Sequence, residues 1–143
     1  MDKPLDLEHF LPYRLSVLTN HISQGIARTY EQRFGLSVTE WRIIAILGRY
    51  PGLSATEIAQ RSAMDKVAIS RAVRRLVDAG RVEREHSNED RRARHLWLSD
   101  EGRRIHDRIV PAALEFEHRL RDLLSMEENR LLDRLIDKLE AGL

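Results

Sequence analysis

The chain has 143 residues, 42% of them hydrophobic and 33% charged, which is ordinary for a single globular domain. It contains no cysteine, which excludes disulfides, thiolate metal sites, a cysteine nucleophile and thiol-based redox sensing. No apolar run approaches the roughly 20 residues that span a bilayer, and the acidic start does not resemble a secretory signal. We therefore expect a cytoplasmic protein without membrane contact.

The charge is unevenly distributed. The formal net charge is +1, yet the stretch from Lys66 to Arg94 holds nine Lys or Arg residues against five Asp or Glu residues, a local balance of +4. A basic stretch inside an almost neutral protein indicates an anionic partner for that stretch alone. The alternative is an ordinary solvated charged face.

The N-terminal segment has helical periodicity. Apolar residues recur every three or four positions, at Leu11, Leu15, Leu18, Ile22, Ile26 and Tyr30. Pro12 is suited to the first position of a helix, and Gly35 can end one. We expect a helix from Pro12 to about Phe34, preceded by a short helical turn at Asp6 to Phe10.

Three capping boxes predict further helix starts. Each has serine at the N-cap and glutamate three residues later, so that the two residues satisfy each other's backbone donors. They lie at Ser37–Glu40, Ser54–Glu57 and Ser125–Glu128. Stop signals follow at Tyr50-Pro51-Gly52 and Ala79-Gly80. Toward the C-terminus we expect helices over Ser99–Leu124 and Met126–Leu139, with a kink at Pro111.

The middle of the chain has the layout of a helix-turn-helix. A capped helix (Ser54–Ser62) is followed by a short turn (Ala63–Asp65) and a second helix (Lys66–Asp78), which Asp65 is placed to cap. At 100° per residue, one face of the second helix is apolar and the opposite face is polar. The apolar face comprises Ile69, Ala72, Val73 and Leu76, whereas Val67, Arg71, Arg74 and Asp78 point away from it, flanked by Ser70 and Arg75.

The outward face of this second helix suits the major groove of DNA. Arginine can form bidentate bonds to guanine, serine can bond either base edge, and valine can contact a thymine methyl group. We predict that the base-reading residues are Val67, Ser70, Arg71 and Arg74, and that the phosphate contacts are Lys66 and Arg75. The alternative is an amphipathic helix with a solvated basic face.

A basic hairpin follows the helix pair. The segments Arg81–Ser87 and Arg94–Leu98 alternate as strands around a polar turn, Asn88–Arg92. Three arginines crowd this turn, namely Arg91, Arg92 and Arg94, and their mutual repulsion calls for a negative partner. A narrow minor groove of DNA has a strongly negative potential and accepts arginine side chains. Asp90 can orient Arg92 through a charge-assisted bond. A solvated loop is the alternative.

The stretch from Asp90 to Gly102 resembles the wing of MarR-type transcriptional regulators, whose pattern is Asp-x-Arg, then Leu-Thr, then Gly. The matching positions are Asp90, Arg92, Leu98 and Gly102. Ser99 replaces the usual threonine and keeps a helix-capping hydroxyl, whereas Trp97 departs from the usual polar residue. Further matching segments are Leu36–Trp41, Glu57–Ala59, Ser70-Arg71 and Leu76–Gly80.

The resemblance implies a mainly α fold with a small β-hairpin wing. Residues 1–143 would form one MarR-like domain, with a winged helix-turn-helix core at 35–98 and dimerisation helices at 1–34 and 99–143. A homodimer would place two recognition helices in successive major grooves of a pseudo-palindromic site. Candidate interface residues are Leu11, Leu15, Leu18, Leu120, Leu124, Leu131, Leu132, Leu135 and Leu139. Packing within one chain is the alternative for any one of them.

The resemblance also implies a possible ligand. Many MarR-type regulators bind small aromatic or phenolic effectors between the dimer helices and the winged domain. His21 and Trp41 are the candidate effector residues here. The alternatives are a surface position for His21 and a core position for Trp41.

Signals of catalysis and of bound cofactors are absent from the sequence. Six histidines occur, but none forms a His-Glu-x-x-His arrangement, and neither a nucleotide-binding glycine loop nor a serine nucleophile elbow is found. We therefore expect no enzyme activity, no metal and no cofactor.

The leading hypothesis is a sequence-specific regulator of transcription that binds double-stranded DNA and acts as a repressor. One alternative is a non-specific architectural DNA-binding protein, whose affinity comes from phosphate contacts alone. Another is a protein-interaction module that uses Trp97 and the acidic outer segments.

Overall fold

The computed structural model describes residues 3–86 and 94–143. The predicted turn Asn88–Arg92 therefore lies outside the described residues. The chain divides into two compact units, residues 1–109 and 110–143, and the boundary falls inside helix α6 (Asp100–Arg121). Within the described ranges, none of the helices combines the length and the apolar character that a membrane span requires.

The first unit begins with a 3-10 turn at Leu7–His9, followed by α1 (Leu11–Ala27) and a short α2 (Glu31–Phe34). The short turn before the first helix is confirmed. Helix α1 starts one residue before Pro12, so the proline occupies the second helical position, where its missing N–H is not needed.

The prediction of one continuous helix to Phe34 is wrong, because the chain leaves the helix after Ala27. The amides of Thr29 and Tyr30 bond three residues back, to Ile26 at 2.9 Å and Ala27 at 3.1 Å, and the Thr29 hydroxyl also bonds the Ile26 carbonyl at 2.6 Å. This tightened turn carries the Tyr30 side chain into the core. The aromatic contacts that favour this burial come from far along the chain, so local periodicity does not report them.

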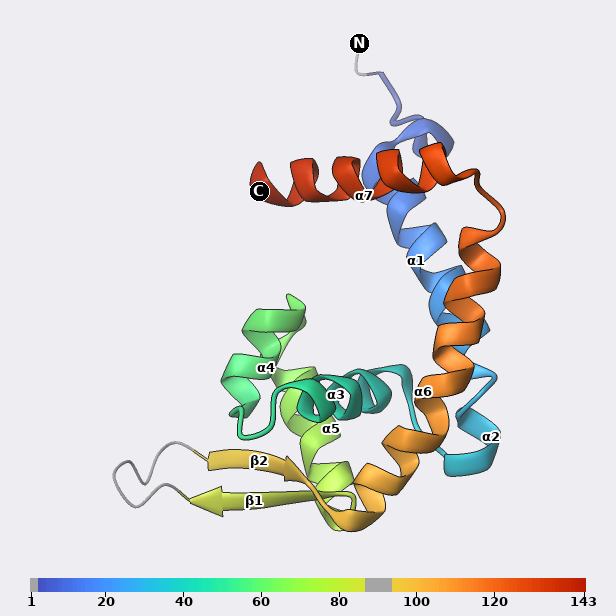
Figure 1. The fold of residues 1–143 in the computed structure, drawn as a ribbon. Coiled ribbons are helices and arrows are strands. Elements are labelled where there is room, and N and C mark those ends of the chain that lie inside the picture. Colours follow the sequence, from blue (N-terminus) through green and yellow to red (C-terminus); the bar gives the residue numbers. More distant parts are fainter. Residues whose placement is uncertain (1–2, 87–93) are drawn as a thin grey trace. The chain divides into compact units, whose positions relative to one another are not determined.

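The helix-turn-helix is confirmed, with α3 (Val38–Arg49) preceding α4 (Ala55–Ser62) and α5 (Lys66–Asp78) (Figure 1). All three predicted capping boxes form. At the start of α4, the Ser54 hydroxyl accepts from the Glu57 amide, and the Glu57 carboxylate accepts from the Ser54 amide, both at 3.1 Å. The helix starts therefore follow from local side-chain chemistry.

The hairpin is confirmed as two antiparallel strands, β1 (Val82–His86) and β2 (Arg94–Leu98). Val82 lies opposite Leu98, and Arg84 lies opposite Leu96. The loop between α3 and α4 adds to this sheet, since the Gly52 amide donates to the Leu96 carbonyl at 2.9 Å and the Leu96 amide donates to the Leu53 carbonyl at 3.0 Å.

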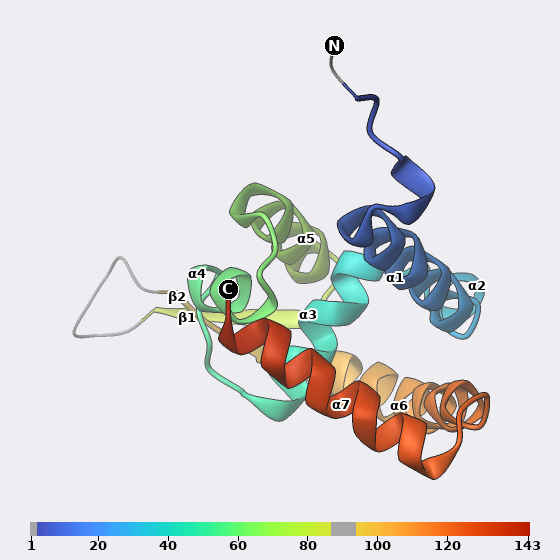
Figure 2. The ribbon, with the colours of Figure 1, turned by 90° about the horizontal axis from the view of Figure 1, so that it is seen from above.

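The core of the first unit lies among these helices and the inner face of the hairpin. Helix α3 lies between α1 and α5 (Figures 1 and 2), while α5 contacts β1 and both α3 and α4 contact β2. The largest fully buried side chains include Tyr30, Leu36, Ile43, Ile44, Leu47, Ile58, Ile69, Leu76, Leu96, Ile105 and Ile109. This core fixes α5 and the hairpin on one scaffold.

A polar junction joins the end of α5 to the start of α6. The Ser99 hydroxyl donates to the Gly80 carbonyl at 2.6 Å and accepts from the Gly102 amide at 3.0 Å, which confirms the predicted capping hydroxyl. Gly102 leaves no room for a side chain, because a Cβ there would overlap the carbonyl oxygen of Arg81.

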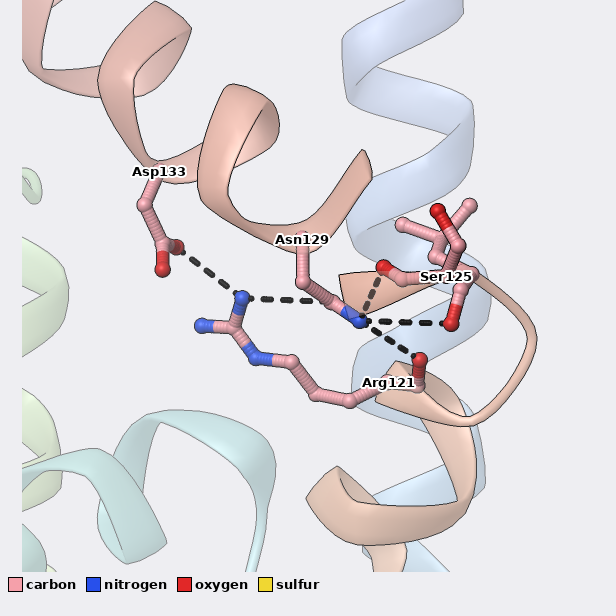
Figure 3. A network of polar contacts seen from close by, with 5 residues as sticks. Arg121, Ser125, Asn129 and Asp133 are labelled. Atoms are coloured by element: carbon pink, nitrogen blue, oxygen red, sulfur yellow. Dashed lines mark hydrogen bonds and ion pairs between the residues drawn. The ribbon is translucent and has the colours of Figure 1, made fainter. Parts of the chain in front are cut away.

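The second unit holds the end of α6 and helix α7 (Met126–Ala141), joined by a polar corner (Figure 3). Arg121 donates to the Asp133 carboxylate at 3.0 Å. The Asn129 amide donates to the carbonyl of Arg121 at 2.9 Å and to that of Ser125 at 3.1 Å. The bond to the Arg121 carbonyl satisfies the end of α6, which ends three residues before the predicted Leu124. Pro111 lies inside α6, and the kink expected there stays a prediction.

Replacing Gly102 by alanine should destabilise the protein by about 1–3 kcal/mol, because the added methyl group must displace the Arg81 backbone. The matched control is Gly142→Ala, where a Cβ would meet its nearest atom at 3.6 Å, an ordinary contact. Thermal or urea unfolding measures both variants. Equal stability of Gly102→Ala and the parent protein would contradict the close approach.

Candidate nucleic-acid interface

Helix α5 is held by its cap and by its apolar face. The Asp65 carboxylate accepts from the Ala68 amide at 3.0 Å, as the predicted N-cap requires. The preceding turn passes through Ala63, whose φ of 53° ends α4 in the left-handed conformation. The predicted inward residues are all buried, namely Ile69, Ala72, Val73 and Leu76. The opposite face of α5 is therefore exposed to solvent.

A basic cavity of about 500 Å³ is lined by the exposed side of α5 and by the hairpin. Most of the residues predicted to contact DNA line this cavity: Lys66, Val67, Ser70, Arg71 and Arg74 from α5, and Arg94 from β2. The apolar lining comes from Ala55, Val73 and Leu96. The structure therefore brings together, across one concave surface, predicted DNA-contact residues that lie up to 28 positions apart in the sequence, from Lys66 to Arg94.

Arg84 is a lining residue that the sequence analysis missed. It lies on β1 opposite Leu96, and therefore on the same face of the hairpin as Leu96 and Arg94. The signal was present in the strand periodicity, because Arg84 lies two residues after the buried Val82.

The two faces of the hairpin differ in charge. Arg84 and Arg94 lie on the face that borders the cavity. Glu83, Glu85 and Trp97 lie on the other face, since side chains alternate along each strand. Positive charge on the hairpin is thus directed toward the outward side of α5.

Arg75 differs from the other cations of α5. Its Nε atom lies 3.5 Å from a carboxylate oxygen of Glu40, the residue that also completes the capping box of α3. The Glu40 side chain is 11% exposed and that of Arg75 is 54% exposed, so the ion pair lies at the edge of the core. Arg75 thus has a partner within the chain. The other predicted wing residues, Asp90, Arg91 and Arg92, lie outside the described residues.

The two candidate effector residues occupy different environments. Trp41 is partly buried, and its ring lies 5.8 Å from that of Tyr30 and 6.5 Å from that of His106. Burial raises the pKa of the Tyr30 hydroxyl, which is therefore neutral near pH 7. His21 is exposed on α1. The structure groups Trp41 with Tyr30 and His106, two residues that the sequence analysis did not propose.

Most of the candidate interface leucines are exposed in the single chain. In the first unit these are Leu11, Leu15 and Leu18, at 45–53% exposure. In the second unit they are Leu124, Leu131, Leu132, Leu135 and Leu139, at 37–50%, while Leu120 is partly buried. Packing inside each unit thus leaves these leucines at least partly exposed.

Comparison with known proteins identifies similar sequences. A sequence model of the MarR family matches residues 34–93. An HTH-type transcriptional repressor of Mycobacterium tuberculosis is 28% identical over 139 residues, which cover 96% of this chain and 94% of the relative. The transcriptional regulator HosA of Escherichia coli O157:H7 is 25% identical over 81% of this chain and 86% of its own length.

Solved structures share the fold over almost the whole chain. A MarR/EmrR family regulator from Acinetobacter sp. ADP1 has a TM-score of 0.86 and 27% identity, covering 96% of this chain and 97% of the other. PcaV from Streptomyces coelicolor, solved with its natural ligand, has a TM-score of 0.82 at 20% identity, covering 98% of both chains. FabT from Streptococcus pneumoniae, solved with DNA, has a TM-score of 0.74 at 22% identity, covering 96% of both chains.

Proposed function

Because the chain belongs to the MarR family of transcriptional regulators, we propose that it binds a specific double-stranded DNA site and acts as a repressor. The observation that carries this proposal is the basic cavity, in which the outward face of a capped helix and the inner face of a hairpin combine their cations. A repressor among its relatives supports the direction of regulation.

The described geometry favours α5 as the base-reading element. Arg71 and Arg74 lie one turn apart on the exposed face, and Val67 is 56% exposed beside them. Their chemistry suits guanine edges and a thymine methyl group, with Ser70 as a further hydrogen-bonding group. Arg75 already pairs with Glu40, so we assign it at most a phosphate contact.

The remaining cations suit the DNA backbone and the flanking groove. Lys66 stands at the first position of α5, where a recognition helix comes close to the phosphates. Arg84 and Arg94 extend the positive surface along the hairpin. We propose that Arg91 and Arg92 continue this line into a minor groove, with Asp90 orienting Arg92.

Replacing Arg71 or Arg74 by alanine should cost about 1–3 kcal/mol of binding free energy at the preferred DNA site and relax the base preference there. Replacing Lys66 by alanine should weaken binding to all sequences to a similar degree. Fluorescence anisotropy with a site selected from random DNA, and with a scrambled site, measures both effects.

The comparison between the two DNA sequences distinguishes reading of bases from simple charge attraction. Equal losses on selected and scrambled DNA for all three variants would contradict base reading by α5. Steep salt dependence without any preferred sequence would instead support the architectural alternative.

We propose that the chain forms a homodimer through residues 1–34 and 99–143, with the winged helix-turn-helix core at 35–98. The exposed leucines support this, since an apolar helix face left in water is normally covered by a partner. Helix α7 is the clearest case, because Leu131, Leu135 and Leu139 recur every four residues and all remain exposed. A two-fold dimer would bind a pseudo-palindromic site.

Replacing Leu135 by aspartate should weaken the dimer by at least about 2 kcal/mol, because the change removes a buried leucine and buries a charge. The matched control is Lys138→Asp, which introduces the same residue at an exposed polar position of α7. Sedimentation equilibrium measures the mass of both. Unchanged assembly of Leu135→Asp would contradict the assignment of this face to the interface.

We propose that a small aromatic or phenolic effector releases the protein from DNA by binding near Trp41. Trp41 forms tilted ring pairs with Tyr30 and His106, and this cluster offers aromatic surface for such a ligand. His21 is retained as a second candidate contact, from α1. A structural relative solved with its natural ligand supports the general idea of ligand control.

Benzoate and phenol are simple probes of this proposal. Each should lower DNA binding by the parent protein, and Trp41→Leu should remove that response while leaving DNA affinity within about twofold, because Trp41 lies outside the cavity beside α5. Anisotropy titrations measure both. An equal response in Trp41→Leu, or no response to either probe in the parent, would contradict effector binding at Trp41.

A further inference from the structure

Trp97 is the residue for which the sequence offered no role. It lies on β2 opposite Glu83, on the face of the hairpin that points away from the cavity, and it remains 38% exposed. An exposed indole on a charged strand has a large apolar surface that folding of the hairpin alone does not require. Its contacts lie instead with the loop between α3 and α4.

The loop accepts the indole because it carries a glycine at the point of contact. A Cβ built on Gly52 would lie 3.0 Å from the Cη2 atom of Trp97 and 3.3 Å from its Cζ2 atom, closer than real Cβ atoms normally approach. Gly52 also has a φ of +88°, which side-chain-bearing residues rarely adopt. The flat ring therefore lies directly against the backbone of this loop.

Polar contacts fasten the same loop to the same strand. The bonds of Gly52 and Leu53 to Leu96 extend the sheet, and the His95 ring donates from Nδ1 to the Gly52 carbonyl at 2.8 Å. We call this set of contacts, from Gly52 and Leu53 to His95, Leu96 and Trp97, the Gly52 clasp. It joins the hairpin to the residue immediately before Ser54, the N-cap of α4.

We propose that Trp97 is a positioning residue for DNA binding, which sets the hairpin at the angle that directs Arg84 and Arg94 toward the outward face of α5. This inference rests on the proposed DNA-binding function. Trp97 itself lies on the opposite face from these arginines, so it acts through the strand and not by contact with DNA.

Restricting the rotation of the hairpin before DNA binds has a physical advantage. A two-stranded hairpin is marginally stable alone, and an arm free to pivot must lose that freedom when it binds. Arg84 and Arg94 have long side chains on neighbouring strands, so a small rotation of the hairpin moves both charged groups together. The Gly52 clasp removes this rotation before DNA arrives, because its contacts lie on both the backbone and the outer face.

The test is a double-mutant cycle on DNA affinity. Arg94→Ala should weaken binding of the selected site about tenfold in the parent protein. In a Trp97→Ala background the same change should cost much less, because Arg94 is already misplaced. Lys66→Ala, on α5 and not on the hairpin, is the matched control, and its loss should be the same in both backgrounds.

The cycle distinguishes failure of the positioning role of Trp97 from failure of the proposed DNA-binding function. An Arg94→Ala loss as large in Trp97→Ala as in the parent overturns the positioning role. If Arg94→Ala has no effect in the parent while Arg71→Ala still does, base reading stands and the inference about Trp97 is wrong. Should Trp97→Ala fail to fold, Trp97→Phe replaces it in the cycle. Arg94→Ala should then still cost less in the Trp97→Phe background than in the parent, by a smaller margin. Equal losses in the two backgrounds would overturn the proposal.

Fluorescence tests the clasp without DNA. The chain has two tryptophans, so Trp41→Phe leaves Trp97 as the sole indole. Gly52→Ala in that background should displace the ring and raise its quenching by acrylamide. It should also reproduce the reduced effect of Arg94→Ala on DNA binding. Unchanged quenching together with an unchanged Arg94→Ala effect would overturn the proposal.

Discussion

The burial of one face of α5 is the constraint on which the rest of the site depends. Ile69, Ala72, Val73 and Leu76 are all at most 3% exposed, and α5 packs against α3, α4 and β1. Rotating the helix by even one residue position would bury an arginine side chain and expose isoleucine or leucine. The orientation of Arg71 and Arg74 is therefore decided by the core, and no contact made by these arginines is needed to hold them outward.

The hairpin is oriented by the same principle. Val82 and Leu96 are buried in the core that holds α5, which decides which face of each strand points inward. Because side chains alternate, the next inward position along β1 is Arg84, at the margin where the core ends and the cavity begins. Two elements anchored in one core thus present their cations to a shared surface.

Local chemistry explains how much of this could be predicted from the sequence. The N-caps Ser37, Ser54 and Asp65 interact with residues three positions away, so a short window of sequence contains the whole signal. The helix-turn-helix and the outward residues of α5 follow from the same short-range rules. The features that could not be predicted depend on residues outside such a window. The helix breaks after Ala27 where Tyr30 is buried against Trp41, and Arg75 forms an ion pair with Glu40. The position of Trp97 likewise depends on Gly52, which lies in another loop.

These distant contacts converge on α3. Glu40, at its first turn, both completes a capping box and pairs with Arg75 of α5. Two residues later, Arg42 donates to the Ser23 hydroxyl of α1 at 3.0 Å and contacts the Met64 sulfur, in the turn before α5, at 3.9 Å. The far end of α3 leads directly into Gly52, which holds the hairpin. A displacement of α3 would thus act on α1, on α5 and on the wing at once. The elements proposed to bind DNA are therefore mechanically linked through a helix that contributes no residue to the lining of the cavity.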